Sequence, residues 1–224
     1  MSTIEPLDRR SSGDHAANHI KRMIFERRLA PGDRVPQDDV AQALGISRIP
    51  VREALIALER EGWITIEMHR GAFVNRFDEQ AVRDHYSMFG LIYGFATRRA
   101  LTRVDDPGDL ADRLMAIIGD LGDDDDAAAA ARVAMKFHAT IVDAARSPRV
   151  QAIVGAMSGL IPGNFFAEVP GAILIERDGL TAIARAVRRK DEAAATKGYE
   201  KMMRQHGDLV VQLLEGRGFF VAPA

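Results

Sequence analysis

Two arginines one helical turn apart could bind DNA in this sequence. The segment from Arg48 to about Glu61 has the apolar spacing of a helix, and Arg48 and Arg52 share one side of its N-terminal end. A guanidinium group can donate two parallel hydrogen bonds to guanine O6 and N7, or it can clamp a phosphate. A neighbouring arc carries the apolar residues Val51, Ala54, Leu55 and Leu58. One face of this helix can therefore dock on other elements while another enters a major groove.

Two isoleucines, Ile49 and Ile56, share the outward side with the arginines. A thymine methyl group would explain one of these apolar side chains on a solvent-facing surface. Ser47 directly precedes the helix and is expected to cap it. The alternative interpretation is an ordinary exposed amphipathic helix whose arginines are incidental.

The elements that must position this helix come before it in the chain. A first helix is predicted from Ser12 to about Leu29, where Pro31 and Gly32 end it. A short second helix is predicted over residues 37–45. Two helices joined by a short turn that contains glycine form a helix-turn-helix, in which the second helix enters the DNA.

A hairpin is predicted directly after the third helix. The apolar pattern changes to the alternation of strands over Trp63–Met68 and again over Ala72–Arg76. His69, Arg70 and Gly71 form the turn between the strands, and a cationic tip with a glycine suits contact with the DNA backbone along the minor groove. Residues 12–77 are thus expected to form a winged helix-turn-helix domain.

The remaining residues, 78–216, are predicted to form an all-helical bundle. Apolar residues recur at helical spacing in segments that proline, glycine and aspartate clusters separate. The predicted helices cover residues 78–103, 107–121, 126–145, 148–160, 172–190 and 191–215. The expected fold class is mostly α, with a winged helix-turn-helix domain and its small β-hairpin followed by the bundle.

Composition restricts the possible functions. The chain has no cysteine, which excludes disulfides, thiolate metal sites and cysteine nucleophiles. Its net charge is −2, and residues 1–77 carry 12 Lys and Arg against 11 Asp and Glu, so DNA binding must depend on where the arginines lie. No apolar run reaches the roughly 18 residues of a membrane-crossing helix, and the first residues have no signal-peptide core. We expect a cytoplasmic protein without a membrane partner.

The N-terminal part resembles the winged-helix domain of the GntR family of bacterial transcription regulators. The resemblance rests on the segments LAPGDRV (29–35), VAQALGISRIPVREAL (40–55), LEREGWI (58–64) and RGAFV (70–74). The helical part, with Phe137 and His138 in its middle, resembles the FCD effector domain of the FadR-like branch. The resemblance implies a homodimer that binds a near-palindromic operator and responds to a small-molecule effector. The candidate DNA-binding residues are Ser47, Arg48, Ile49, Arg52, His69, Arg70 and Gly71.

The sequence departs from the family at two positions in the helix-turn-helix. The family often has an arginine where this chain has Asp38, which removes an expected phosphate contact. It often has a threonine where this chain has Ile49, so that hydroxyl contact is also lost.

The helical part departs further from its family. Many FCD domains hold a divalent metal ion with one aspartate and three histidines. His138 matches the first histidine, but Ala134, Leu180 and Met202 stand at the other positions, and His206 lies one turn beyond the last. Because most of the nitrogen and oxygen ligands are lost, we expect no metal cofactor, and His138 and His206 are the remaining metal candidates.

The segment His85–Ala96 is apolar nearly all round, so it must be buried on several sides. It belongs either to a dimer interface or to a pocket for an apolar ligand. The candidate effector-binding residues are His85, Phe89, Tyr93, His138 and His206. The alternative function is a histidine-centred, metal-dependent enzyme built on the bundle, although no His-Glu-x-x-His motif or nucleophile elbow is present. A regulator that is not an enzyme is the function we expect.

Overall fold

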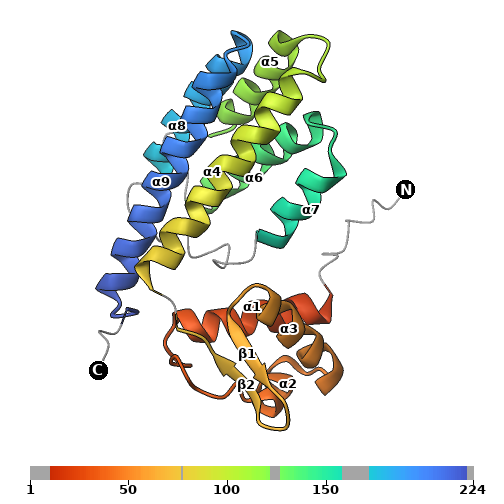
Figure 1. The fold of residues 1–224 in the computed structure, drawn as a ribbon, viewed down its shortest axis with the longest axis vertical. Coiled ribbons are helices and arrows are strands. Elements are labelled where there is room, and N and C mark those ends of the chain that lie inside the picture. Colours follow the sequence, from red (N-terminus) through yellow and green to blue (C-terminus); the bar gives the residue numbers. More distant parts are fainter. Residues whose placement is uncertain (1–10, 77, 122–126, 158–171, 221–224) are drawn as a thin grey trace. The chain divides into compact units, whose positions relative to one another are not determined.

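The chain contains two compact units, which divide between Phe77 and Asp78. The computed structural model describes residues 11–76, 78–121, 127–157 and 172–220 (Figure 1). The described residues are mainly helical, with a small antiparallel hairpin that follows the N-terminal helix-turn-helix. This confirms the predicted fold class.

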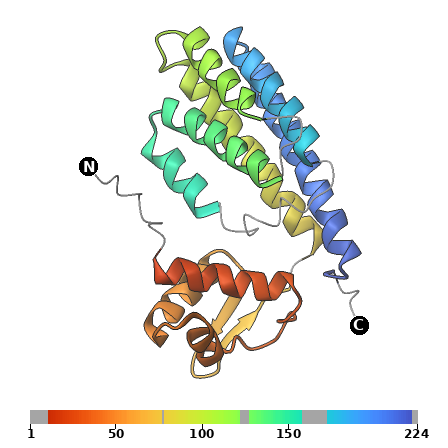
Figure 2. The same ribbon diagram turned by 180° about the vertical axis from the view of Figure 1, so that it is seen from behind.

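In its described residues, 11–76, the first unit consists of three helices and the hairpin. Its elements are α1 (Ser12–Phe25), α2 (Gln37–Leu44), α3 (Arg48–Arg60), β1 (Ile64–Glu67) and β2 (Gly71–Val74). A capping box begins α1, in which the Ser11 hydroxyl accepts from Asp14 N at 3.1 Å and Asp14 accepts from Ser11 N at 2.8 Å. Helix α1 contacts both α2 and α3 (Figure 2).

Helix α1 is shorter than the sequence predicts, because it ends at Phe25 and not near Leu29. Arg27 adopts a left-handed conformation (φ 57°), and the N–H groups of Arg28 and Leu29 both return to Met23 O. This C-terminal closure satisfies carbonyl groups at the helix end and turns the buried Leu29 toward the core.

Trp63 lies at the centre of the first unit, only 1% exposed. The edge of its ring meets Phe25 with the ring centroids 5.2 Å apart. Lys21 lies over the Trp63 ring with its ammonium 5.7 Å from the ring centroid and pairs with Glu61 beyond the end of α3. The partly buried pair of Lys21 with Glu61 and the aromatic side chain of Trp63 thus join α1, the end of α3 and the start of the hairpin.

The hairpin strands pair from Ile64 with Val74 to Glu67 with Gly71, so both are shorter than predicted. Residues 32–35 extend this small sheet along β2, where Val35 N donates to Ala72 O and Val74 N donates to Asp33 O. The Ile66 N–H donates to Glu59 Oε1 at 2.8 Å, which ties β1 to α3. The wing is therefore held at a set position beside the third helix.

The second unit is all-helical in the part that the structure describes. Its elements are α4 (Glu79–Leu101), α5 (Pro107–Gly119), α6 (Ala127–Ala144), α7 (Pro148–Met157), α8 (Ala172–Arg188) and α9 (Glu192–Gly216). Helices α4 and α9 lie side by side along most of their length (Figures 1 and 2). Glycines permit this approach, because a Cβ at Gly90 would lie 3.0 Å from Glu200 Cα and one at Gly94 would lie 2.9 Å from Thr196 Cγ2.

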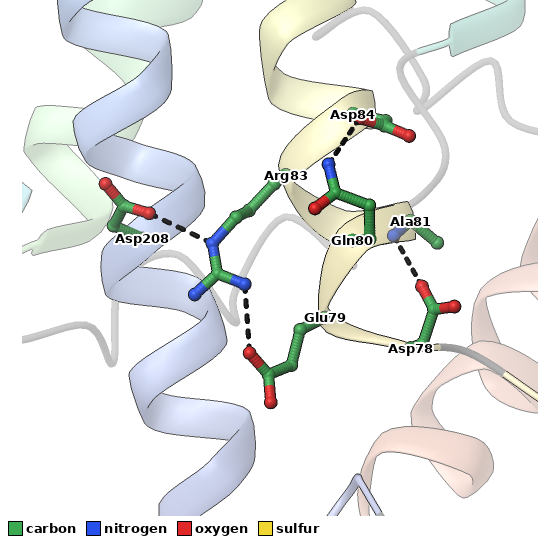
Figure 3. A network of polar contacts seen from close by, with 7 residues as sticks. All are labelled: Asp78, Glu79, Gln80, Ala81, Arg83, Asp84 and Asp208. Carbon is green, nitrogen blue, oxygen red and sulfur yellow. Dashed lines mark hydrogen bonds and ion pairs between the residues drawn. The ribbon is translucent and has the colours of Figure 1, made fainter.

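Polar contacts fasten the first turns of α4 (Figure 3). The Asp78 carboxylate caps the helix by accepting from Ala81 N at 2.7 Å. Arg83 donates from Nη1 to Glu79 at 2.9 Å and from Nε to Asp208 of α9 at 3.2 Å. The pairing of Arg83 with both helices sets the N-terminal end of α4 against α9.

Candidate DNA interface and buried ligand site

Helix α3 has the two faces that the sequence predicts. Its buried side chains are Val51, Ala54, Leu55 and Leu58. Arg48 and Arg52 are exposed, and so are Ile49 (69%) and Ile56 (48%). Because the apolar face docks on the rest of the unit, the arginines and isoleucines share one outward surface of α3, with Arg48, Ile49 and Arg52 at its N-terminal end.

The N-terminal end of α3 differs from the prediction in its cap. Ser47 occupies the cap position, but its side chain accepts no hydrogen bond from the described helix backbone. Arg48, the first helical residue, forms a two-point pair with Asp38 of α2: Nε lies 2.6 Å from Oδ1 and Nη2 lies 2.9 Å from Oδ2. Both side chains are 65% exposed.

The hairpin tip presents His69 and Arg70 to solvent. His69 has a left-handed backbone (φ 62°). Gly71 has φ 118°, a backbone angle that residues other than glycine rarely adopt. A Cβ at Gly71 would also lie 2.6 Å from Arg34 Nε. Arg70 pairs with Glu67 and lies 5.5 Å from the Phe73 ring centroid.

Arg34 is a cation of this surface that the sequence interpretation missed. It is exposed, forms a bridge with Phe73 of β2, and brings its guanidinium under Gly71. Arg34 belongs to the segment PGDRV, on which the family resemblance partly rests. Its place at the hairpin, however, depends on the pairing of residues 32–35 with β2.

A second cluster of polar side chains is buried inside the helical unit. Glu176 of α8 lies between two histidines, with Oε2 at 3.1 Å from His206 Nε2 and Oε1 at 3.7 Å from His138 Nε2. His138 Nδ1 in turn lies 3.3 Å from the hydroxyl of Tyr199. Helices α6, α8 and α9 thus each contribute to one cluster, in which the side chains of Glu176 and His206 are at most 5% exposed.

Burial changes the pKa of each titratable group in this cluster. Desolvation raises the pKa of Glu176 to about 8, lowers that of His206 to about 4 and lowers that of His138 to about 3. Near pH 7 the glutamic acid therefore keeps its proton, and both histidines are neutral. Desolvation also raises the pKa of Tyr93 to about 12, with a smaller contribution from Glu176. The cluster is uncharged at neutral pH.

A column of rings on α4 leads to the same cluster. His85 meets Phe89 edge-on at 4.9 Å, Phe89 stacks on Tyr93 at 5.5 Å, and Tyr93 stacks on His138 at 4.5 Å between centroids. The structure therefore brings together the predicted effector residues Tyr93, His138 and His206. Phe89 and His85 lie successively further along the column.

Glu176 and Tyr199 were missed by the sequence interpretation. Glu176 stands in the apolar stripe of α8 with Ala172, Leu180 and Ile183, and a carboxylate at such a position indicates a buried polar contact. Its Oε1 atom makes no hydrogen bond with described residues, and neither does Thr196 Oγ1. Buried polar atoms without hydrogen bonds are places where a ligand or water can bind.

The metal site that the FCD family implies does not fit this chain. Ala134, Leu180 and Met202 occupy three of its four positions, and all three are apolar and buried. Among the described residues, no group of three or more His, Asp or Glu is arranged to hold a metal ion. We therefore derive no role for a metal in ligand binding.

Comparison with known proteins agrees with this architecture. Residues 13–74 match the family described as bacterial regulatory proteins of the gntR family, and residues 84–208 match the FCD domain. Both matches fall within the units that carry the exposed arginines and the buried polar cluster, respectively. A winged helix-turn-helix joined to a helical FCD domain defines a class of bacterial regulatory protein. The chain belongs to the GntR family and carries an FCD domain.

Relatives of this chain carry names of the same kind. An HTH-type transcriptional regulator of Mycobacterium tuberculosis (Rv0043c) is 33% identical over 153 residues, or 68% of this chain and 62% of that protein. The match thus spans less than two thirds of the relative's length. The HTH-type transcriptional repressor RspR of Escherichia coli is 33% identical over 85 residues, which cover 38% of this chain and 37% of that protein.

Solved structures share the fold at low sequence identity. The Escherichia coli protein McbR/YncC gives a TM-score of 0.61 at 17% identity, covering 91% of this chain and 99% of that one. A GntR family member from Pseudomonas syringae gives a TM-score of 0.55 at 20% identity, covering 92% of this chain and 87% of that one.

Among the described helices, none combines the length and the apolar character that crossing a bilayer requires.

We expect Glu176→Gln to change how the stability of the protein depends on pH. Folding raises the pKa of Glu176 from about 4.5 to about 8, so the folded state holds a proton that the unfolded state releases, and stability is lost as pH rises through this window. Glutamine does not titrate. In urea unfolding, the free energy of unfolding of the variant relative to that of the wild type should rise by about 1–3 kcal/mol between pH 5 and pH 8. The upper limit is set by roughly 1.4 kcal/mol for each unit of pKa shift.

The two histidines act in the opposite direction. Their lowered pKa values cost stability only as pH falls below about 6.5. The Gln substitution does not change this loss of stability at low pH. A stability difference between wild type and Glu176→Gln that stays constant from pH 5 to pH 8 would contradict the prediction.

Proposed function

We propose that this chain is a transcription regulator that binds operator DNA through its winged helix-turn-helix unit. The observation that carries the proposal is the outward surface of α3, where Arg48 and Arg52 stand one turn apart beside exposed Ile49. Arginine and an apolar side chain at this position suit guanine and the thymine methyl group in a major groove. The exposed His69 and Arg70 at the hairpin tip suit the adjacent backbone.

A cytoplasmic location is part of the proposal, because the proposed partner, bacterial DNA, is found there. The alternative of a metal-dependent enzyme is not favoured, because both parts of the chain match a family of regulatory proteins.

The helical unit is proposed to hold a small-molecule effector at the buried polar cluster, without a metal cofactor. The support is the convergence of Tyr93, His138 and His206 on Glu176, together with the buried Glu176 Oε1 that lacks a hydrogen bond among the described residues. Because the cluster itself is uncharged near pH 7 and offers no cation, it suits an uncharged ligand with hydrogen-bonding groups.

The same unit is proposed to form the homodimer. Met88, Leu91 and Phe95 lie on one side of α4 at helical spacing and are 47%, 58% and 48% exposed. Contiguous exposed apolar side chains of this size indicate a protein interface. The segment His85–Ala96 was interpreted either as a dimer interface or as part of a ligand pocket. Tyr93 and Ala96 are buried inside the unit, whereas Leu91 and Phe95 are exposed, so we propose that one face of the segment lines the pocket and the other forms the interface.

Arg52→Ala should weaken binding to a selected operator duplex by about 1–3 kcal/mol, because a base contact by an arginine is worth that much. Fluorescence anisotropy on the operator and on a scrambled duplex measures the effect. Arg60→Ala is the matched control, since it removes the same charge from the other end of α3. Equal affinity of the wild type for the operator and the scrambled duplex would refute the proposed function.

Leu91→Asp should convert the dimer into a monomer, because a carboxylate would be buried in the apolar interface without a partner. Light scattering after size-exclusion chromatography gives the molar mass. Met135→Asp serves as a control, since Met135 is 64% exposed on α6 and lies on a different helix. If Leu91→Asp remains dimeric at micromolar concentration, the interface lies elsewhere.

A thermal-shift screen of small metabolites should find compounds that raise the melting temperature of the wild type by binding the folded state. Glu176→Ala should reduce that shift, whereas Lys136→Ala, at an exposed position of α6, should keep it. Compounds that stabilise both variants as well as the wild type would place the effector site outside the buried cluster.

A further inference from the structure

The pair between Asp38 and Arg48 places a carboxylate on the surface proposed to face DNA. Asp38 is in the first turn of α2 and Arg48 is the first residue of α3, so the contact joins the two helices of the helix-turn-helix. The two short contacts, 2.6 Å to Nε and 2.9 Å to Nη2, hold the planar guanidinium by one edge.

This contact contributes little to folding. Both side chains are 65% exposed, and exposed ion pairs add at most about 1 kcal/mol to stability. A role of the pair should therefore be sought in the free end of the arginine, which remains directed away from Asp38. Nη1 and the second hydrogen on Nη2 are the two parallel donors that guanine O6 and N7 accept in direct readout.

The charge of Asp38 also selects between the two possible targets of Arg48. A phosphate that approached the guanidinium would meet the negative charge of the aspartate, and Asp39 follows it on the same turn. The edge of a guanine base carries partial charges only, so it meets far less repulsion. The carboxylate thus disfavours a backbone contact by Arg48 while it leaves a base contact available.

We propose that Asp38 is a positioning residue for base recognition, which holds Arg48 by its Nε edge so that the opposite end reads one guanine in each half-site. This inference rests on the proposed DNA-binding function and adds to it the base that one residue reads. Because the held side chain has lost rotamer freedom before it binds, the cost of ordering it in the groove is lower.

The test compares the base preferences of variants. Duplexes are first selected from a random library with the wild-type protein, and affinities are then measured for the selected duplex, its guanine-to-adenine derivatives and a scrambled duplex. The guanine read by Arg48 is the position at which Arg48→Ala no longer discriminates. At that position, the ratio of affinities for the guanine duplex and its adenine derivative should fall about tenfold in Asp38→Ala. A change of this size is within the discrimination that a bidentate contact provides. The affinity of Asp38→Ala for the scrambled duplex should rise, because a negative charge is removed.

Asp39→Ala is the matched control. It removes the same charge from the same exposed turn, but Asp39 has no pair with Arg48 among the contacts of the described residues. It should raise affinity for the scrambled duplex to a similar extent and keep the guanine preference. In the Arg48→Ala background, Asp38→Ala should change no base preference, which separates positioning of Arg48 from a general effect of charge. Because the exposed pair contributes little to folding, thermal melting should differ only slightly among these variants.

The outcomes separate the two proposals. If the wild type selects no sequence, the proposed function fails and the role of Asp38 fails with it. If the wild type selects a site but Asp38→Ala keeps its guanine preference, only the role of Asp38 is overturned. The same holds if Arg48→Ala changes no base preference at any position.

Discussion

The docking of one apolar helix face decides the rotation of α3, and the proposed DNA surface depends on that rotation. Val51, Leu55 and Leu58 are at most 3% exposed, so a turn of the helix about its axis would expose them to water. Their burial directs Arg48 and Arg52 outward. The buried Trp63 and the pair between Lys21 and Glu61 set the hairpin beside the same helix. Two elements that carry cations are thereby held by the apolar core of one small unit.

The helical unit buries several polar side chains inside an otherwise apolar bundle. An ionised carboxylate would be costly there, and burial raises the pKa of Glu176 until the acid is neutral at pH 7. Because Glu176 is protonated and His206 is neutral at pH 7, the pair needs no counter-ion. Polar groups that are buried and incompletely hydrogen-bonded lower the stability of a fold, and natural proteins tolerate them mainly at functional sites.

Two members of the buried cluster, Glu176 and His206, each stand one helical turn away from a metal-ligand position that the family resemblance implies. Glu176 precedes Leu180 by four residues on α8, and His206 follows Met202 by four residues on α9. Leu180 and Met202 are each 1% exposed, so the implied positions have become part of the apolar core. A displacement by one turn keeps side chains on the same face of a helix, which explains why the polar residues still converge.

The sequence by itself determined the elements, their order and the faces of the helices. The spacing of apolar residues in α3 and of His85, Phe89 and Tyr93 in α4 is a local property of a helix, and it predicted which residues share a side. Helix ends were predicted less well, because the left-handed Arg27 that closes α1 depends on hydrogen bonds to Met23 and on the burial of Leu29.

Only the tertiary structure decided which residues from different elements meet. Asp38 was interpreted as a lost phosphate contact, and the packing of α2 on α3 brings it to Arg48. Glu176 was not singled out at all. Its place in the apolar stripe of α8 indicates burial, but only the packing of α8 against α6 and α9 shows that it meets His138 and His206. Periodicity along a chain records the direction of each side chain, whereas the partner it meets depends on contacts between residues far apart in sequence.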